Sequence, residues 1–482
     1  MRSRLPRRFA PRNDVMRLED LKFKRTMIEI NEIQIARECI KTALEKGASA
    51  ARISLNKSVS DSVAMLNGEV DKVSHSADRS LYFYIFADGR YGTFSTNRLD
   101  MDELVPFIGN AIEMVKMLGE DECRTLPDPS RTAKDAITGQ ELGLYDVKYA
   151  DTDADSRIAS AEKLSIYKEI VSNPQEGFRV ISEECEYTDS YDDTFLIDSN
   201  GFEGRHTETT FSAFAEMTIE DAEGNKYSGF WWENSPMSDK LKIETISRTA
   251  LERAAGQIGP KSRRGGRYKM VVDRTSASRL ISPLITALNA ASVQQKMSFL
   301  EDKIGEQVFP EGMNLMDMAR SVGKSGSRLY DTEGVATQNM PIIENGVVKQ
   351  YFVNTYMANK MGIEPTIEDM SRPCLMPYLK GKDLSDAEKE VSLKDILQIC
   401  ANGIYVTGFN GGNCNPVTGD FSYGIEGFAF SKGKITHPVK EMLITGNIVD
   451  LWNSLLAAGT DVRESSRWYI PTLAFENVSF SA

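Results

Sequence analysis

The alternation of hydrophobic and polar residues predicts a chain that changes between helix and strand several times. Residues 31–46 place apolar side chains at helical spacing, and residues 101–118 repeat that pattern. Between them, residues 81–86 form an aromatic-rich run typical of a strand. Asn67-Gly68 and Asp88-Gly89 lie between alternating apolar runs and predict two-residue hairpin turns. The pattern therefore predicts a first α+β unit over residues 27–120.

A second unit with the same plan is predicted over residues 151–259, after a linker at 121–150 that is rich in Asp, Pro and Thr. Helices are expected at 153–171 and 244–255, and the run 211–219 between them alternates like a strand. Turns are expected at Asn200-Gly201 and Gly224-Asn225.

The remaining residues, 260–482, predict a strand-rich C-terminal domain with a barrel-like or curved sheet. Asn345-Gly346 predicts a hairpin turn, and helices are expected at 384–400 and 447–458. The glycine-rich run 408–427 suits bulges and close backbone packing better than a ligand cradle. The whole chain is thus predicted to be α+β, with N-terminal helix/antiparallel-sheet units before this domain.

One predicted helix, at 280–293, contains neither a charged residue nor a histidine. We expect Ser282 to cap it and Pro283 to occupy its first turn. Leu280, Leu284 and Leu288 then form an apolar stripe, which predicts a core helix followed by a polar turn.

The charge of the chain limits the classes of molecule expected to bind it. The 482 residues hold 57 Lys and Arg against 70 Asp and Glu, a formal net charge of -13. Nucleic acid is therefore not expected as a partner. No apolar stretch of about 20 residues predicts a membrane span. Residues 1–26 are rich in arginine and lack the apolar core of a secretory signal. They predict either a disordered basic tail or a start codon placed upstream of Met16 or Met27.

Residues that ligate metals or act as nucleophiles are few and scattered. The six cysteines form no C-x-x-C pair, which favours free thiols in the cytoplasm. None of the three histidines, His75, His206 and His437, has another His or a Cys at ligand spacing, so no metal site is expected. The motif VGKSGS at 322–327 lacks the first glycine of a phosphate loop, and we interpret it as a turn.

Three blocks of the C-terminal unit, in this order, resemble the TldD/PmbA family, named for modulation of DNA gyrase. They are KMSFLEDKIGEQV, DTEGVATQNMPIIENGVVKQYFVNTYMANKMG and TGDFSYGIEGFAFSKGKITHPVKEMLITGNIVDLW. The resemblance extends from about residue 31 to the C-terminus and is strongest after residue 268.

The resemblance implies one of two subunit types. TldD-type chains carry His-Glu-x-x-x-His on a helix and a C-terminal cysteine, which together hold a metal. An ungapped count back from Gly305 places the two histidines at Ile281 and Thr286 and the glutamate at Ser282. Residues 460–482 contain no cysteine either. The chain thus resembles the TldE type, also called PmbA, which lacks the metal ligands.

The resemblance implies a role as the non-catalytic subunit of a cytoplasmic heterodimeric metalloprotease. The TldD-type partner would hold the zinc, no cofactor would bind this chain, and the complex would degrade or trim unfolded peptides. One alternative is a stand-alone homodimer that binds peptides without cleaving them. Another is an active peptidase that uses His437, Cys414 and Glu306.

No catalytic residue is predicted in this chain. The candidates for contact with a partner or peptide lie in the polar turn after the core helix and in the glycine-rich run. They are Lys296, Ser298, Glu306, Asn410, Gly411, Gly412, Asn413 and Asn415.

Overall fold

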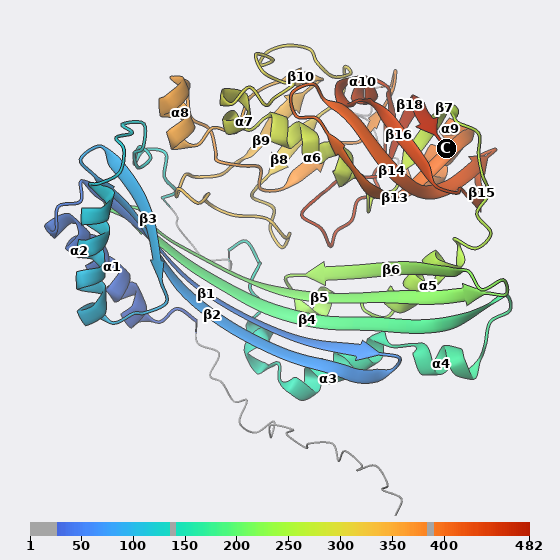
Figure 1. Cartoon of the computed structure of the whole chain (residues 1–482), viewed down its shortest axis with the longest axis horizontal. Coiled ribbons are helices and arrows are strands. Elements are labelled where there is room, and N and C mark those ends of the chain that lie inside the picture. Colours follow the sequence, from blue (N-terminus) through green and yellow to red (C-terminus); the bar gives the residue numbers. More distant parts are fainter. Residues whose placement is uncertain (1–26, 135–140, 383–389) are drawn as a thin grey trace, which may run out of the picture.

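The computed structural model describes residues 27–134, 141–382 and 390–482. A long curved sheet carries helices on one side and faces a compact C-terminal part on the other (Figure 1). The fold is therefore α+β, as predicted. The predicted tail or misassigned start at 1–26 lies outside the described residues.

Six antiparallel strands form the long sheet in the order β3-β2-β1-β4-β5-β6. They are β1 Ala50–Leu66, β2 Glu69–Ala87, β3 Arg90–Thr96, β4 Phe178–Asp198, β5 Glu203–Asp221 and β6 Lys226–Ser235. Strand β1 pairs with β2 on one side and with β4 on the other. Strands from the predicted first and central units thus share one sheet. The predicted turns Asn67-Gly68 and Asp88-Gly89 are confirmed, with all four residues at positive φ.

Helices cover one face of this sheet. At one end, Ile53, Leu55 and Phe83 are fully buried beneath α1 Ile30–Glu45 and α2 Met101–Val115. At the other end, Phe211 and Met217 are buried in a second core. The helices of that end are α3 Ala154–Leu164, α4 Tyr167–Ser172 and α5 Ile246–Ala255. Odd-numbered residues of the strands supply both cores, because successive side chains point to opposite faces.

The prediction of one continuous helix at 153–171 is wrong, because the structure has two separate helices there, α3 and α4. The buried carboxylate of Glu183 accepts the backbone N–H of Ile166 at 2.8 Å and the hydroxyl of Ser165. An N–H that bonds to a side chain cannot continue the helical ladder, so the chain turns at this point.

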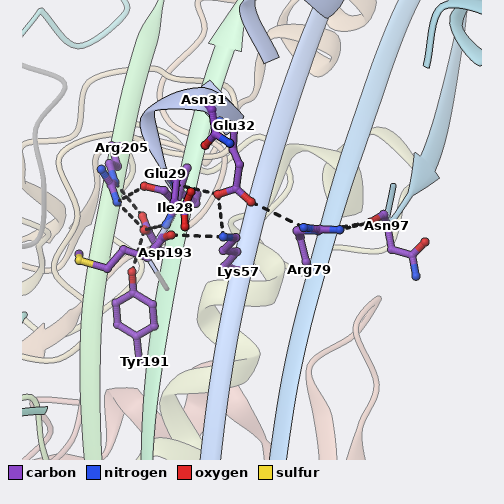
Figure 2. Close-up of polar contacts among 11 residues, drawn as sticks. Ile28, Glu29, Asn31, Glu32, Lys57, Arg79, Asn97, Tyr191, Asp193 and Arg205 are labelled. Carbon is purple, nitrogen blue, oxygen red and sulfur yellow. Dashed lines mark hydrogen bonds and ion pairs between the residues drawn. The ribbon is translucent and has the colours of Figure 1, made fainter. Parts of the chain in front are cut away.

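The chain enters the sheet through a polar cluster on the helix-covered face (Figure 2). The N–H of Ile28 donates to Asp193 Oδ2 at 2.8 Å, and Arg205 donates to the carbonyl of Ile28 at 3.1 Å. Lys57 Nζ donates to the carbonyl of Met27 at 3.2 Å and pairs with Glu32 at 2.6 Å. These contacts fix the start of α1 against three strands.

The C-terminal part is built on an eight-stranded sheet in which β18 also pairs with β7, so part of it closes into a barrel. The predicted barrel-like domain is therefore confirmed. Its strands are β7 Gly266–Val272, β12 Tyr378–Leu379, β13 Asn402–Cys414, β14 Asp420–Ser431, β15 Lys434–Pro438, β16 Met442–Asn447, β17 Leu455–Ala458 and β18 Leu473–Ser481. A four-stranded sheet accompanies it, with β8 Leu315–Met318, β9 Asn339–Glu344, β10 Val347–Val348 and β11 Pro373–Leu375. The predicted Asn345-Gly346 turn joins β9 to β10.

Two predicted helices of this part are shorter than expected. The helix at 447–458 ends early, because α10 spans Ile448–Asn453 and the next residues form β17, which pairs with β18. The helix at 384–400 is α9 Leu393–Cys400, which begins at a capping box between Ser392 and Asp395. Residues 384–389 of that prediction lie outside the described part. A further helix, α8, spans Thr355–Met361.

The sheet and the C-terminal part meet at a small apolar cluster. The ring of Tyr330 packs edge-on against Phe202, with ring centroids 5.2 Å apart. Gly204 of β5 lies beneath both rings, and a Cβ there would come within 2.7 Å of Tyr330. A cleft of about 500 Å³ beside this cluster is lined by residues from both sides, including Tyr82, His206 and Arg328.

Candidate functional site

The candidate site lies where the predicted core helix meets the glycine-rich strands. The predicted single helix is two helices, α6 Ser278–Ala287 and α7 Ala290–Gln294. Helix α6 begins earlier than expected, so Ser282 is not its cap and Pro283 lies inside it. Leu280, Leu284 and Leu288 are fully buried, which confirms the predicted apolar stripe.

The other wall comes from the glycine-rich hairpin β13–β14. Its pairing shifts between Asn410 and Asn413, so Gly411 and Gly412 bulge out of the ladder. A Cβ on Gly412 would lie 1.9 Å from the carbonyl oxygen of Ser422, and one on Gly427 would lie 2.1 Å from that of Tyr405. The predicted close backbone packing is therefore confirmed.

A pocket of about 190 Å³ lies between α6 and this hairpin. Its lining residues are Arg279, Ser282, Pro283, Thr286, Ala287, Phe299, Asn413, Cys414, Pro416 and Tyr423. The lining includes one cation, three side-chain hydroxyl groups, one side-chain amide and an apolar wall, but neither a carboxylate nor a histidine. A zinc or other divalent metal site needs imidazole, thiolate or carboxylate ligands, and only Cys414 is of that kind. This donor set does not fit a metal.

The guanidinium of Arg279 is held at the edge of the pocket. It lies 4.9 Å from the ring centroid of Tyr423, and Nη2 donates to the carbonyl of Gly412 at 3.0 Å. Thr286 turns its hydroxyl back to the carbonyl of Ser282 at 3.1 Å. Burial raises the pKa of the Cys414 thiol, and nearby Asp420 raises it further. Cys414 is thus a weak nucleophile in this setting.

The predicted contact residues do not form one site. Asn413 lines the pocket, whereas Asn410 lines a separate cleft of about 590 Å³ with Phe230 and Trp232. Asn415 Oδ1 accepts the N–H of Val417 at 2.9 Å and so shapes a turn.

The polar turn after α6 is separate from the pocket. Lys296 pairs with Glu301, and Glu306 pairs with Lys303 at 2.8 Å. Ser298 is buried and donates to the carbonyl of Ala287 at 2.6 Å. Its hydroxyl thus holds the end of α6, and contact of Ser298 with a partner or peptide stays a prediction.

Arg279 was missed by the sequence interpretation because the helix was expected to begin at Leu280. The signal was available, since Arg279, Ser282 and Thr286 follow one another at spacings of three and four residues, which place them on one helix face.

The described ranges contain no cluster of metal-ligating residues elsewhere either. Within residues 27–134, 141–382 and 390–482, no three His, Cys, Asp or Glu residues lie where they could hold a metal ion. His437, Cys414 and Glu306, all within these ranges, are therefore not brought together as one metal site. None of the helices in those ranges is long and apolar enough to span a membrane.

Comparison with known proteins identifies the family. Three models of PmbA/TldA metallopeptidase domains match the chain: domain 1 at 51–115, the central domain at 148–258 and the C-terminal domain at 265–482. The metalloprotease PmbA of Escherichia coli O157:H7 is 24% identical over 439 residues, covering 90% of this chain and 93% of that protein.

Two crystal structures are also similar. A protein of Bacteroides thetaiotaomicron assigned as a DNA gyrase modulator is 39% identical, with a TM-score of 0.88 over 95% of this chain and 100% of that one. TldE of Thermococcus kodakarensis shares the fold, with a TM-score of 0.76, 18% identity and coverage of 93% and 100%. The sequence blocks, the domain matches and the fold agree, and the chain belongs to the PmbA/TldD family.

Proposed function

We propose that this protein is the non-catalytic, TldE-type subunit of a heterodimeric PmbA/TldD-family metalloprotease. Its TldD-type partner would hold the zinc and cleave, while this chain would complete the complex and help to hold unfolded peptide. The six thiols, all free, fit a reducing compartment, so we place the complex in the cytoplasm.

The composition of the pocket beside α6 carries this proposal. In TldD-type relatives a helix of this region presents His-Glu-x-x-x-His. Here the positions with that spacing that line the pocket are Ser282, Pro283 and Ala287. The ungapped count gave Ile281, Ser282 and Thr286, but Ile281 is buried in the core. A shift of one residue along the helix brings all three positions to the pocket. A hydroxyl, a pyrrolidine and a methyl group neither bind zinc nor take a proton from a metal-bound water.

Peptide holding is supported by the cleft between β6 and the C-terminal sheet. Phe214, Phe230 and Trp232 stack in a row along β5 and β6, with neighbouring ring centroids 6.3 and 6.0 Å apart. Phe230 and Trp232 line the 590 Å³ cleft, and Phe230 is 48% exposed. Exposed aromatic rows suit the apolar side chains of an unfolded chain.

The test is cleavage of an unfolded substrate such as casein by three samples: this chain, a TldD-type chain of the same source, and their mixture. Each is assayed with and without a chelator. Chelator-sensitive cleavage that needs both chains is expected. Chelator-sensitive cleavage by this chain alone would overturn the proposal. Peptide binding by a self-associating chain that forms no complex with the partner would favour the homodimeric alternative.

A further inference from the structure

Arg279 is a cation without a counter-charge in an acidic protein. Arg37 and Arg98, which are also exposed, pair with Glu203 and Glu103 at 2.7 Å. Across the described ranges no carboxylate lies within ion-pair distance of Arg279, and none lines its pocket. The chain has 70 acidic residues, yet none lines the pocket beside Arg279. The positive charge at this pocket therefore favours an anionic ligand.

The guanidinium is already placed for such a ligand. The ring of Tyr423, 2% exposed, lies on one side at 4.9 Å, and Nη2 donates to Gly412 at 3.0 Å. These two contacts leave Nε and Nη1 without a protein acceptor in the described ranges. Because the side chain is held before binding, less rotamer entropy is lost when an anion arrives.

Neighbouring groups extend the site. Ser282, one turn further along α6, presents a hydroxyl for which the described residues offer no acceptor, and Asn413 adds an amide. Both donors reach the pocket beside Arg279. Arg279 also lies in the first turn of α6, a ten-residue helix whose N-terminal end favours negative charge.

The size and the apolar wall limit the ligand to a small group. Phe299, Pro283 and Pro416 line the side of the pocket away from the donors. A volume of about 190 Å³ is slightly larger than the roughly 150 Å³ cavity that takes a benzene molecule. The pocket thus accommodates one carboxylate next to one small or medium apolar side chain, rather than a long peptide segment.

We propose that this pocket binds the C-terminal residue of a peptide, with the carboxylate on Arg279 and Ser282 and the side chain against Phe299. This proposal rests on the proposed function in one respect, that the ligand with the carboxylate is a peptide. It gives the pocket an anion-binding role at a place where the donor set excludes a metal.

The experiment measures binding to the full chain by fluorescence anisotropy. Two labelled hexapeptides share one sequence that ends in leucine, and one has a free carboxylate and the other an amidated C-terminus. The free acid is expected to bind about tenfold more tightly, since one charge-assisted hydrogen bond contributes roughly that factor. Arg279→Gln should abolish the difference between acid and amide, and Arg279→Lys should keep part of it. Arg98→Gln is the matched control and should change nothing.

Equal binding of acid and amide would overturn the proposal, as would no detectable binding of either peptide. An acid preference that survives in Arg279→Gln would also overturn it. N-acetyl-leucine that competes as well as the whole peptide would overturn the peptide assignment. The measurement uses this chain alone, so its failure is distinguishable from failure of the two-chain cleavage assay.

Discussion

Arg205 holds Asp193 through two parallel hydrogen bonds, Nε to Oδ1 at 2.9 Å and Nη2 to Oδ2 at 2.6 Å. The Asp193 side chain is fully buried, and it also accepts from Tyr191 and from the N–H of Ile28 (Figure 2). One carboxylate therefore joins two strands to the segment that leads into α1.

Asp193→Asn should destabilise the protein by about 3 kcal/mol, because it leaves a guanidinium against a neutral partner in a largely dry site. The amide of Ile28 should also exchange faster with deuterium, since it loses a charged acceptor. Urea unfolding and hydrogen exchange measure the two effects. Arg37→Gln, which breaks an exposed pair, is the control and should cost less than about 1 kcal/mol. Equal effects of the two substitutions would contradict the assignment.

Asp331 should make stability fall as pH rises. Burial raises the pKa of this carboxyl to about 6, against 3.8 for the free side chain. The folded protein therefore binds the proton more tightly than the unfolded chain. The stabilisation is complete below pH 4 and is lost between pH 4 and 6, with a size on the order of 3 kcal/mol.

The measurement compares the free energy of unfolding of the native protein and Asp331→Asn from pH 4 to 7. Asparagine keeps an acceptor for the N–H groups of Glu333 and Val335, at 2.9 and 3.0 Å in the native protein. The native protein should lose stability relative to the variant as pH rises. A constant difference would show that Asp331 does not titrate in this range.

Gly204→Ala should loosen the contact between the long sheet and the C-terminal part. Its Cβ would meet Phe202 at 2.6 Å and Tyr330 at 2.7 Å, so one ring must move. We expect a lower Tm, equivalent to about 1–3 kcal/mol. Tyr330→Ala in the same chain should recover part of the loss, because it removes one of the colliding rings. Gly119→Ala, where nothing lies within 4 Å, is the control.

The six cysteines should react in two classes. Cys123 and Cys414 are partly exposed, whereas Cys39, Cys185, Cys374 and Cys400 are buried. Burial raises the pKa of Cys39 and of Cys185 to about 12, so neither forms thiolate near neutral pH. Alkylation followed by mass spectrometry should modify the first pair in the native protein and all six after denaturation. Modification of Cys39 before Cys414 would contradict the buried core beneath α1.

The sequence predicted elements best where local chemistry decides them. Asn67-Gly68 adopts its hairpin because both residues tolerate positive φ, a property visible in two letters. The break between α3 and α4 depends on Glu183, which reaches Ile166 only after β4 has joined the sheet, so no local pattern reports it. The pairing of β1 with β4 was missed for the same reason.

The candidate site was predicted in part. The helix that the resemblance indicated lines the pocket, and the glycine-rich run forms the other wall. The role of Ser298 in holding the end of α6 was not predicted, because a serine in a polar turn has the same sequence signature whether its hydroxyl points outward or holds a helix end. Arg279 was missed because the helix was expected to begin one residue later, and its contacts with Tyr423 and Gly412, more than 130 residues away, have no local pattern.

The central position of β1 also determines the order of events on the ribosome. Residues 50–66 can pair with β2 as soon as that strand emerges, but their other edge waits for β4 at residues 178–198. At a synthesis rate of roughly 5–20 residues per second this interval is on the order of ten seconds. Throughout it, a nascent chain presents a seventeen-residue open edge, long enough to pair with a neighbouring copy on the same polysome. A chaperone that covers this edge should therefore raise the yield of the whole protein, although it never touches the C-terminal barrel.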